Sequence, residues 1–184
     1  MDPDGMTPLG YVRPRIRAAR ASDLRHVAPI EDAGGPQFAE HFGEAVEPVL
    51  LSPATDGRHR AAEPGFLLVA VGEDDEPVGF VHVLELDGHA HLEQLSVHPT
   101  HQRRGIGAAL TRAAIAEARA RGFDRLSLCT YRDVPWNGPF YRSLGFAEVA
   151  EADLAPYERR LREVERDLRL DVNGVRVVMS IALG

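Results

Sequence analysis

The sequence lacks several features that mark special classes of protein. It has one cysteine, Cys129, so an internal disulfide is impossible, as expected for a reducing compartment. No apolar run approaches the roughly 18 residues that a membrane helix requires, and the first residues lack the basic and apolar regions of a signal peptide. We therefore expect a cytoplasmic protein without a membrane partner.

Positive charge is also scarce. The chain has 21 Lys and Arg against 28 Asp and Glu, a net charge of −7, which argues against nucleic acid as the main partner and suits a cationic ligand. Apolar residues make up 44% of the 184 residues, which excludes a disordered or fibrous protein. The length fits one domain, which we place at residues 14–184 after a flexible arm at residues 1–13.

The most informative stretch runs from His91 to Leu110 and is typical of a strand, a turn and the opening of a helix. Pro99 ends the strand, and Gly105 and Gly107 lead into an alanine-rich helical run. Glycines let the backbone curl so that free N–H groups converge at the positive end of a helix dipole. The stretch therefore predicts a site for a phosphate or pyrophosphate.

The spacing of this loop excludes two common phosphate sites. No Walker string is present, and a dinucleotide fingerprint would need Gly or Ala where Leu110 stands. The run Gln102-Arg-Arg-Gly-Ile-Gly107 instead resembles the acyl-CoA loop of the GNAT superfamily of N-acyltransferases, whose pattern is Gln/Arg-x-x-Gly-x-Gly/Ala. The alternative is a glycine-hinged turn before an ordinary helix.

A second motif carries the same resemblance. Phe140-Tyr141-x-x-x-Gly145-Phe146 matches the end of a pattern common in the superfamily, Asn-x-x-Ala-x-x-Phe-Tyr-x-x-x-Gly-Phe. Asn137 stands three residues closer to the Phe-Tyr pair than the pattern has its asparagine, so the match is complete for Tyr141 and incomplete for Asn137.

The resemblance implies an acetyl-CoA-dependent N-acetyltransferase with an α/β fold. That fold is a mixed, mostly antiparallel sheet of about seven strands, flanked by helices, whose parallel central pair is splayed to hold CoA. Acetyl-CoA is then the cosubstrate, and no metal is implied. The residues expected to contact CoA are Leu95, Ser96, Val97, Gln102, Arg103, Arg104, Gly105, Ile106, Gly107, Ala108 and Asn137.

The patterns of the chain itself agree with such a sheet. Residues 66–71, 78–86 and 89–97 read as three consecutive antiparallel strands joined by tight turns. A helix follows residues 102–107, which we call the glycine loop. Because this helix is a crossover between the strands at 89–97 and 123–130, we expect these two strands to run parallel. Further strands are predicted at 15–19, 146–150 and 175–181, and helices from Ser22 or Asp23, at 37–46, at 136–145 and at 156–168. Residues 52–64 show no periodicity and predict a mobile surface loop.

Acetyl transfer to an amine requires a base, because an ammonium group has no free lone pair and its pKa lies at roughly 10. Glu93 precedes the loop at the position where many superfamily members have a glutamate. Strict alternation places Glu93 on the face of Leu95 and Val97, so a bulge is needed to direct it at the acceptor. Tyr141 is expected to protonate the departing thiolate. For both residues a purely structural role is the alternative.

The acceptor is expected to be a small cationic amine in a site formed by the first two helices. Glu31 and Asp32 are candidates for binding its charge, with a solvated acidic surface as the alternative reading. His89 and His91 share a strand face, and either one is the reserve base. No third ligand has the spacing for a metal site.

The sequence leaves three points open. The acceptor is alternatively a protein lysine or N-terminus, the chain is alternatively a regulatory domain that binds acyl-CoA without turnover, and a homodimer is one option for its assembly.

Overall fold

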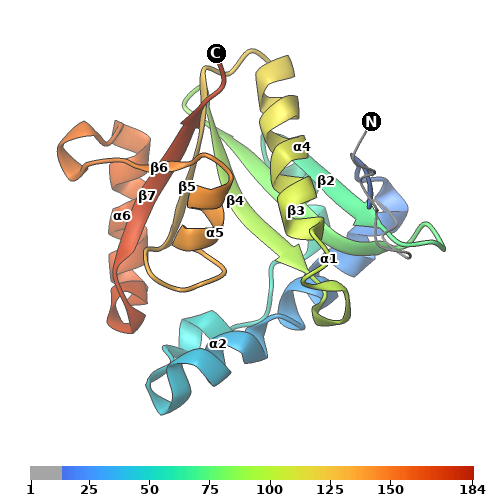
Figure 1. Cartoon of the computed structure of the whole chain (residues 1–184), viewed down its shortest axis with the longest axis horizontal. Coiled ribbons are helices and arrows are strands. Elements are labelled where there is room, and N and C mark those ends of the chain that lie inside the picture. Colours follow the sequence, from blue (N-terminus) through green and yellow to red (C-terminus); the bar gives the residue numbers. More distant parts are fainter. Residues whose placement is uncertain (1–13) are drawn as a thin grey trace, which may run out of the picture.

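The structure is a computed structural model that describes residues 14–184, so the arm expected at residues 1–13 lies outside the described residues. A seven-stranded sheet with the order β1-β2-β3-β4-β5-β7-β6 runs through the molecule (Figure 1). The strands are β1 (Arg15–Ala18), β2 (Gly65–Val71), β3 (Pro77–Leu86), β4 (His89–Val97), β5 (Arg125–Tyr131), β6 (Ala147–Glu148) and β7 (Arg176–Ala182). The helices are α1 (Leu24–Asp32), α2 (Gly35–Phe42), α3 (Gly57–Ala62), α4 (Ile106–Ala120), α5 (Gly138–Ser143) and α6 (Pro156–Asp167).

Every neighbouring pair in the sheet is antiparallel except β4 and β5, which are parallel. The crossover between these two strands is α4, as the helical pattern between them predicts. The expected mixed, mostly antiparallel sheet with a parallel central pair is thus confirmed.

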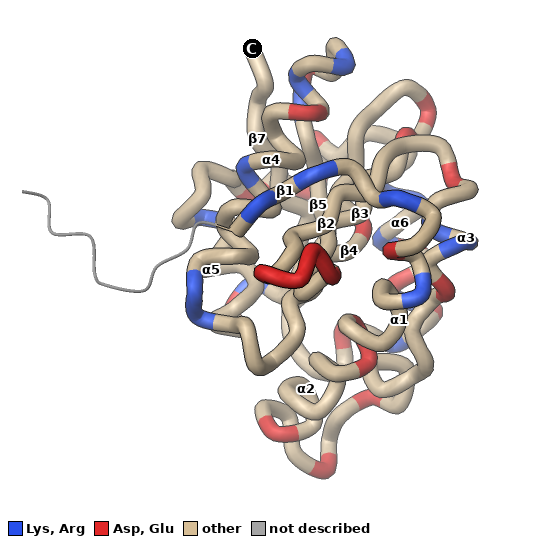
Figure 2. Tube along the Cα trace, turned by 90° about the vertical axis from the view of Figure 1, so that its right-hand side faces the viewer, with Lys and Arg blue, Asp and Glu red and all other residues tan. Residues whose placement is uncertain are grey.

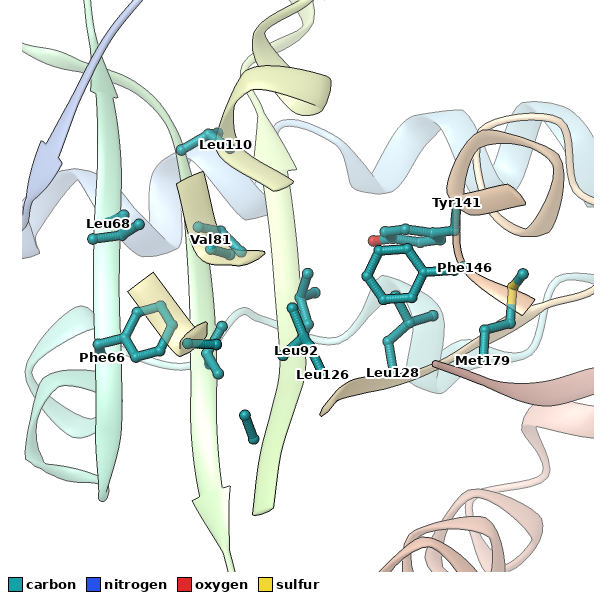
Figure 3. Packing of buried hydrophobic residues seen from close by; sticks show 14 of the residues in the cluster. Phe66, Leu68, Val81, Leu92, Leu110, Leu126, Leu128, Tyr141, Phe146 and Met179 are labelled. Atoms are coloured by element: carbon teal, nitrogen blue, oxygen red, sulfur yellow. The ribbon is translucent and has the colours of Figure 1, made fainter. Parts of the chain in front are cut away.

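Helices cover both faces of the sheet. On one face α4 and α5 pack over the larger core, in which Val81, Leu92, Leu110, Leu128 and Tyr141 are buried (Figure 3). On the other face α1 packs on β2 and β3 over a smaller core, and α6 lies under β4 and β5. α2 lies beyond the C-terminal ends of the parallel strands (Figure 1), where its aromatic side chains meet the end of β5.

α4 is anchored at the positions that its pattern predicts. Leu110, Ala114 and Ala118 are fully buried, and the small alanines let the helix approach the sheet closely. The sheet makes room in turn, because a Cβ on Gly79 of β3 would lie only 3.3 Å from Leu110 Cδ1. This packing fixes the start of α4, and with it the glycine loop, against β3 and β4.

The prediction of a loop at residues 52–64 is wrong for Gly57–Ala62, which form α3. The carboxylate of Asp56 caps α3 by accepting a hydrogen bond of 2.8 Å from the N–H of Arg58. Gly57 packs so closely on α1 that an added Cβ would lie 2.3 Å from the carbonyl oxygen of Leu24. A helix of six residues is too short to show a clear periodicity, so only this tertiary contact identifies it.

Charged residues of both signs are interspersed along the chain, and the acidic run at residues 73–76, in the turn between β2 and β3, lies at the front of Figure 2. None of the helices in residues 14–184 combines the length and the hydrophobicity needed to cross a lipid bilayer.

The core beneath the glycine loop yields a stability prediction. Leu110→Ala is expected to lower the free energy of unfolding by about 2–5 kcal/mol, because it removes buried methyl groups and leaves a cavity between α4 and β3. Val164→Ala on α6 is the control, since Val164 is 54% exposed and should change stability by less than about 0.5 kcal/mol. Urea denaturation of the three proteins measures both values, and equal losses in the two variants would contradict the assignment of this core.

Candidate functional site

The glycine loop ends in a helix N-terminus with free backbone donors. Arg103 and Gly105 adopt positive φ angles of 59° and 73°, and α4 begins immediately afterwards at Ile106. Within residues 14–184 no side chain caps this helix end. The first N–H groups of a helix have no partner inside it, so those of α4 are available to an anion.

The loop is tied to the strand that precedes it. Gln102 Nε2 donates a hydrogen bond of 3.1 Å to the carbonyl oxygen of Val97, the last residue of β4. Arg103 and Arg104 are exposed, and neither forms an ion pair with another of the described residues. Their charges are therefore available to a bound phosphate. Ile106, in contrast, is buried and serves the core.

Gly107 lies beside side chains of β4 and α5. A Cβ built on Gly107 would lie 3.5 Å from Phe140 Cζ and 4.0 Å from Leu95 Cδ2, so a single added carbon would already contact both side chains. Ala108 beside it is half-buried. The start of α4 thus lies next to both β4 and α5.

The two parallel strands pair over only part of their length, and we call the region between their unpaired ends the gap. β4 and β5 pair only from Ala90 with Leu126 to Leu92 with Leu128, yet β4 continues to Val97 and β5 to Tyr131. Beyond Leu92 the two strands therefore diverge, and the β5-facing backbone groups of β4 lack strand partners. Leu95, Ser96 and Val97 lie along this open edge, half-buried.

Glu93 lies where the divergence begins, in a β-bulge. The register pairs Val83 with Leu92 and His82 with Gln94, so Glu93 is an extra residue in β4. A bulge of this kind redirects a side chain. Leu92 and Leu95 both pack against the core under α4, whereas Glu93 contacts groups on the opposite face. The bulge that the alternation required is present.

The carboxylate of Glu93 is held through one of its two oxygens. Oε2 accepts hydrogen bonds from Arg60 Nη1 and from His82 Nδ1, the latter at 3.1 Å. Among the described residues no donor contacts Oε1, and the side chain is 37% exposed. Burial by itself would raise the pKa of Glu93, but the hydrogen bond from His82 and the charge of Arg60 outweigh it and lower the pKa. Glu93 is therefore ionised at neutral pH.

The two acidic residues expected to bind the acceptor have partners within the protein. Glu31 Oε2 accepts a hydrogen bond of 2.8 Å from Arg60 Nη2, and burial raises the pKa of Glu31. Asp32 accepts a hydrogen bond of 2.7 Å from the N–H of Ala54. The charge of Glu31 is thus balanced by Arg60, and Asp32 ties α1 to the segment before α3.

Tyr141 extends from α5 with its hydroxyl directed toward β4 (Figure 3). Its ring is packed edge-on between Phe140 and Phe146, with centroid distances of 5.0 and 5.7 Å. Burial raises the pKa of the Tyr141 hydroxyl, which therefore stays protonated at neutral pH. Asn137 precedes α5 as its N-cap residue, but its side chain forms no capping hydrogen bond.

His91 belongs to a buried network at the closed end of the strand pair. Its Nδ1 lies 2.9 Å from Ser127 Oγ, which lies 2.9 Å from the hydroxyl of Tyr157. Burial lowers the pKa of His91 to about 4, so the imidazole is neutral. His89 stacks on Tyr157 with a centroid distance of 4.8 Å. No three His, Cys, Asp or Glu side chains in residues 14–184 are grouped as a metal site.

The structure adds an aromatic cluster that the sequence did not predict. Phe38 of α2 contacts Trp136 edge-on at 5.9 Å, and Phe42 of α2 contacts Tyr131 at the end of β5 at 5.5 Å. The spacing of Phe38 and Phe42 signals one helix face, but nothing in the sequence identifies the opposing aromatic residues. We call these four residues the aromatic wall.

Comparisons with known proteins agree with this geometry. The family model of the acetyltransferase (GNAT) family matches residues 34–146. The chain is 32% identical over 101 residues to an aminoglycoside N(6')-acetyltransferase type 1 of Klebsiella aerogenes, covering 50% of this chain and 66% of that protein. It is 48% identical over 52 residues to a mycothiol acetyltransferase of Clavibacter sepedonicus, covering 28% of this chain and 17% of that protein. The chain thus spans less than two thirds of either relative.

Solved structures share the fold. A GNAT-family acetyltransferase of Staphylococcus aureus Mu50 has a TM-score of 0.66 at 17% identity, covering 92% of this chain and 99% of that one. An aminoglycoside 6'-N-acetyltransferase in complex with coenzyme A has a TM-score of 0.60 at 16% identity, covering 92% and 97%. The motifs, the splayed strand pair and the match of the family model together show that this chain belongs to the acetyltransferase (GNAT) family.

Proposed function

We propose that this protein transfers an acetyl group from acetyl-CoA to the primary amine of a small cationic molecule, by direct attack and without an acyl-enzyme. The observation that carries the proposal is the place of Glu93, an ionised carboxylate with one free oxygen at the start of the gap between β4 and β5. A base is needed there, because the acceptor amine is protonated at neutral pH.

The CoA moiety is proposed to bind from the glycine loop into the gap. Its pyrophosphate would contact the N–H groups from Gly105 to Ala108 and the side chains of Arg103 and Arg104. The thioester would lie beside the unpaired edge of β4, where backbone N–H groups from Leu95 to Val97 stabilise the negative oxygen of the tetrahedral intermediate. Tyr141 would donate its proton to the departing thiolate.

The acceptor is proposed to enter between Glu93 and the aromatic wall. The faces of Phe38, Phe42 and Trp136 attract a cation, and Glu93 offers the negative charge. The name of the Klebsiella aerogenes relative makes aminoglycosides a first class of acceptor to test, since they carry several primary amines on a polar scaffold.

A screen of amines with acetyl-CoA, read as release of free thiol, tests the function. The chain contains no lysine, so no side-chain amine of the enzyme competes as an acceptor. Its single cysteine, Cys129, adds at most a constant background to the thiol signal. The panel contains aminoglycosides, polyamines, amino sugars and a lysine peptide, each with a hydroxyl analogue as the control. We expect turnover with a small cationic amine. Turnover with the peptide alone would indicate a protein acetyltransferase, and CoA binding without any turnover would indicate a regulatory domain.

CoA binding is predicted to depend on the absence of a side chain at Gly107. Gly107→Val should weaken acetyl-CoA binding by at least roughly tenfold in calorimetry, because a Cβ at this position already contacts Phe140 and Leu95 and the further methyl groups would crowd the proposed pyrophosphate site. Ala116→Val on the exposed face of the same helix is the matched control and should bind as the wild type does. Unchanged affinity in Gly107→Val would remove this loop from the CoA site.

Tyr141 is predicted to act in turnover and not in binding. Tyr141→Phe should lower kcat by roughly 10²-fold or more while the affinity for acetyl-CoA stays the same, because general acid catalysis typically supplies this factor. The buried ring keeps its packing in this variant, so a change in fold is not expected. Full turnover in Tyr141→Phe would exclude the hydroxyl as the acid.

Glu93 is predicted to matter most where the acceptor is protonated. Glu93→Gln keeps the shape and removes the base, so kcat/KM should fall strongly at neutral pH. The difference in kcat/KM between wild type and Glu93→Gln should become smaller as the pH rises toward the pKa of the amine, roughly 10, because free amine becomes abundant there. Parallel pH profiles would show that Glu93 is not the base.

A further inference from the structure

Arg60 is a buried cation placed by a helix that packs rigidly on α1. Its side chain is 5% exposed, and its helix α3 is fixed by the close contact of Gly57 with Leu24. Burying a guanidinium is costly unless carboxylates compensate it. Two carboxylates do so here, since Nη1 donates to Glu93 and Nη2 donates to Glu31 at 2.8 Å.

His82 on β3 is the second group that fixes Glu93. A carboxylate only accepts hydrogen bonds, so His82 Nδ1, 3.1 Å from Glu93 Oε2, must carry the proton. The other nitrogen, Nε2, is buried without a partner among the described residues, as is Arg60 Nε. Both donors therefore act on the same oxygen of Glu93, and Oε1 is left free.

We propose that Arg60 and His82 are positioning residues that hold Glu93 by Oε2 and direct Oε1 at the acceptor, and that Glu31 is the counterion that keeps Arg60 compensated when Glu93 takes up a proton. This inference rests on the proposed function, in which Glu93 is the base.

The charges of the cluster balance through the proton transfer. Glu31 and Glu93 carry two negative charges against the one positive charge of Arg60, so a monocationic ammonium group makes the assembly neutral. One N–H bond of the ammonium breaks and an O–H bond forms at Glu93 Oε1. The freed lone pair forms the C–N bond while the carbonyl π electrons move to the oxygen. When the C–S bond breaks, the thiolate takes the proton of Tyr141, and the second N–H proton of the acceptor nitrogen passes to the Tyr141 oxygen. Afterwards Glu93 is neutral, and the remaining pair of Arg60 and Glu31 is still balanced. Without Glu31 the same step would leave Arg60 as an uncompensated buried charge.

Four groups face Glu93: Arg60 from α3, His82 from β3, Glu31 from α1 and His91 from β4 itself. Arg60 is the one permanent cation among them. Removing it should therefore raise the pKa of Glu93 by about 1–3, the range by which a neighbouring arginine lowers a carboxylate pKa.

An NMR titration of the Glu93 carboxyl carbon measures this effect without any acceptor. The signal is assigned by its loss in Glu93→Gln, and the proteins compared are wild type, Arg60→Met and Arg58→Met. Arg58 lies on the same helix, is exposed and forms no ion pair among the described residues, so it is the matched control. An upward shift in Arg60→Met alone is expected. An unshifted pKa in a folded Arg60→Met would overturn the proposal.

Kinetics then separate positioning from folding. The acid limb of kcat/KM should move to higher pH in Arg60→Met by the same amount as in the titration. Arg60→Lys should keep the limb in place but lower kcat roughly tenfold or more, because one ammonium cannot bridge two carboxylates as a guanidinium fork does. His82→Asn retains an N–H near the position of Nδ1 and should recover activity that His82→Ala loses. If all variants lose activity to the same extent, with no shift of the acid limb and no recovery in His82→Asn, then Arg60 and His82 have only a structural role.

The two proposals fail in different ways. If wild type releases no thiol with any amine, the proposed function is wrong, and Glu31, Arg60 and Glu93 are only a structural ion network. If wild type turns over but the limb is unmoved in folded Arg60→Met, the function stands and the role of Arg60 is wrong. Thermal unfolding of each variant shows which proteins are folded.

Discussion

The divergence of β4 and β5 after Leu92 and Leu128 is the constraint on which the rest of the site depends. Strand backbone that loses its partner must satisfy its polar groups elsewhere, with water or with a ligand. Two features lie at this point: the extra residue Glu93 bulges out of β4 in its pairing with β3, and α5 packs Tyr141 and Phe140 on the larger core.

β4 also relates the two parts of the proposed site. The glycine loop follows the end of β4 and Glu93 lies at the bulge within it, so one strand fixes the proposed phosphate site and the proposed base relative to each other. Where β4 and β5 are still paired, His91 contacts Ser127, and both residues are buried. In the proposed function, the sheet would hold each reacting group at its distance, as catalysis by orientation requires.

Sequence reasoning succeeded where the signal is local or periodic. Alternation and turn residues located β2, β3 and β4, and the alanine face located α4. Strict alternation placed Glu93 on the core face, away from an acceptor, and this conflict predicted the bulge. Sequence reasoning failed for α3, because a helix of six residues is too short to show a clear periodicity. The contact of Gly57 with α1 fixes the position of this helix, and no sequence pattern shows that contact. Arg60 and His82 were missed for the same reason, since they meet Glu93 only through tertiary packing. Glu31 appeared as a free acid because no pattern shows its partner.

A crystal structure of the protein with CoA is the measurement that tests the role of the splayed strands most directly. The pantetheine arm is expected between β4 and β5, with hydrogen bonds to the backbone from Leu95 to Val97, the pyrophosphate on residues 103–108 and the thiol near Tyr141. The strands themselves should stay where they are, because they already diverge. CoA bound elsewhere on the sheet, or strands that close on each other when it is bound, would contradict this view of the site.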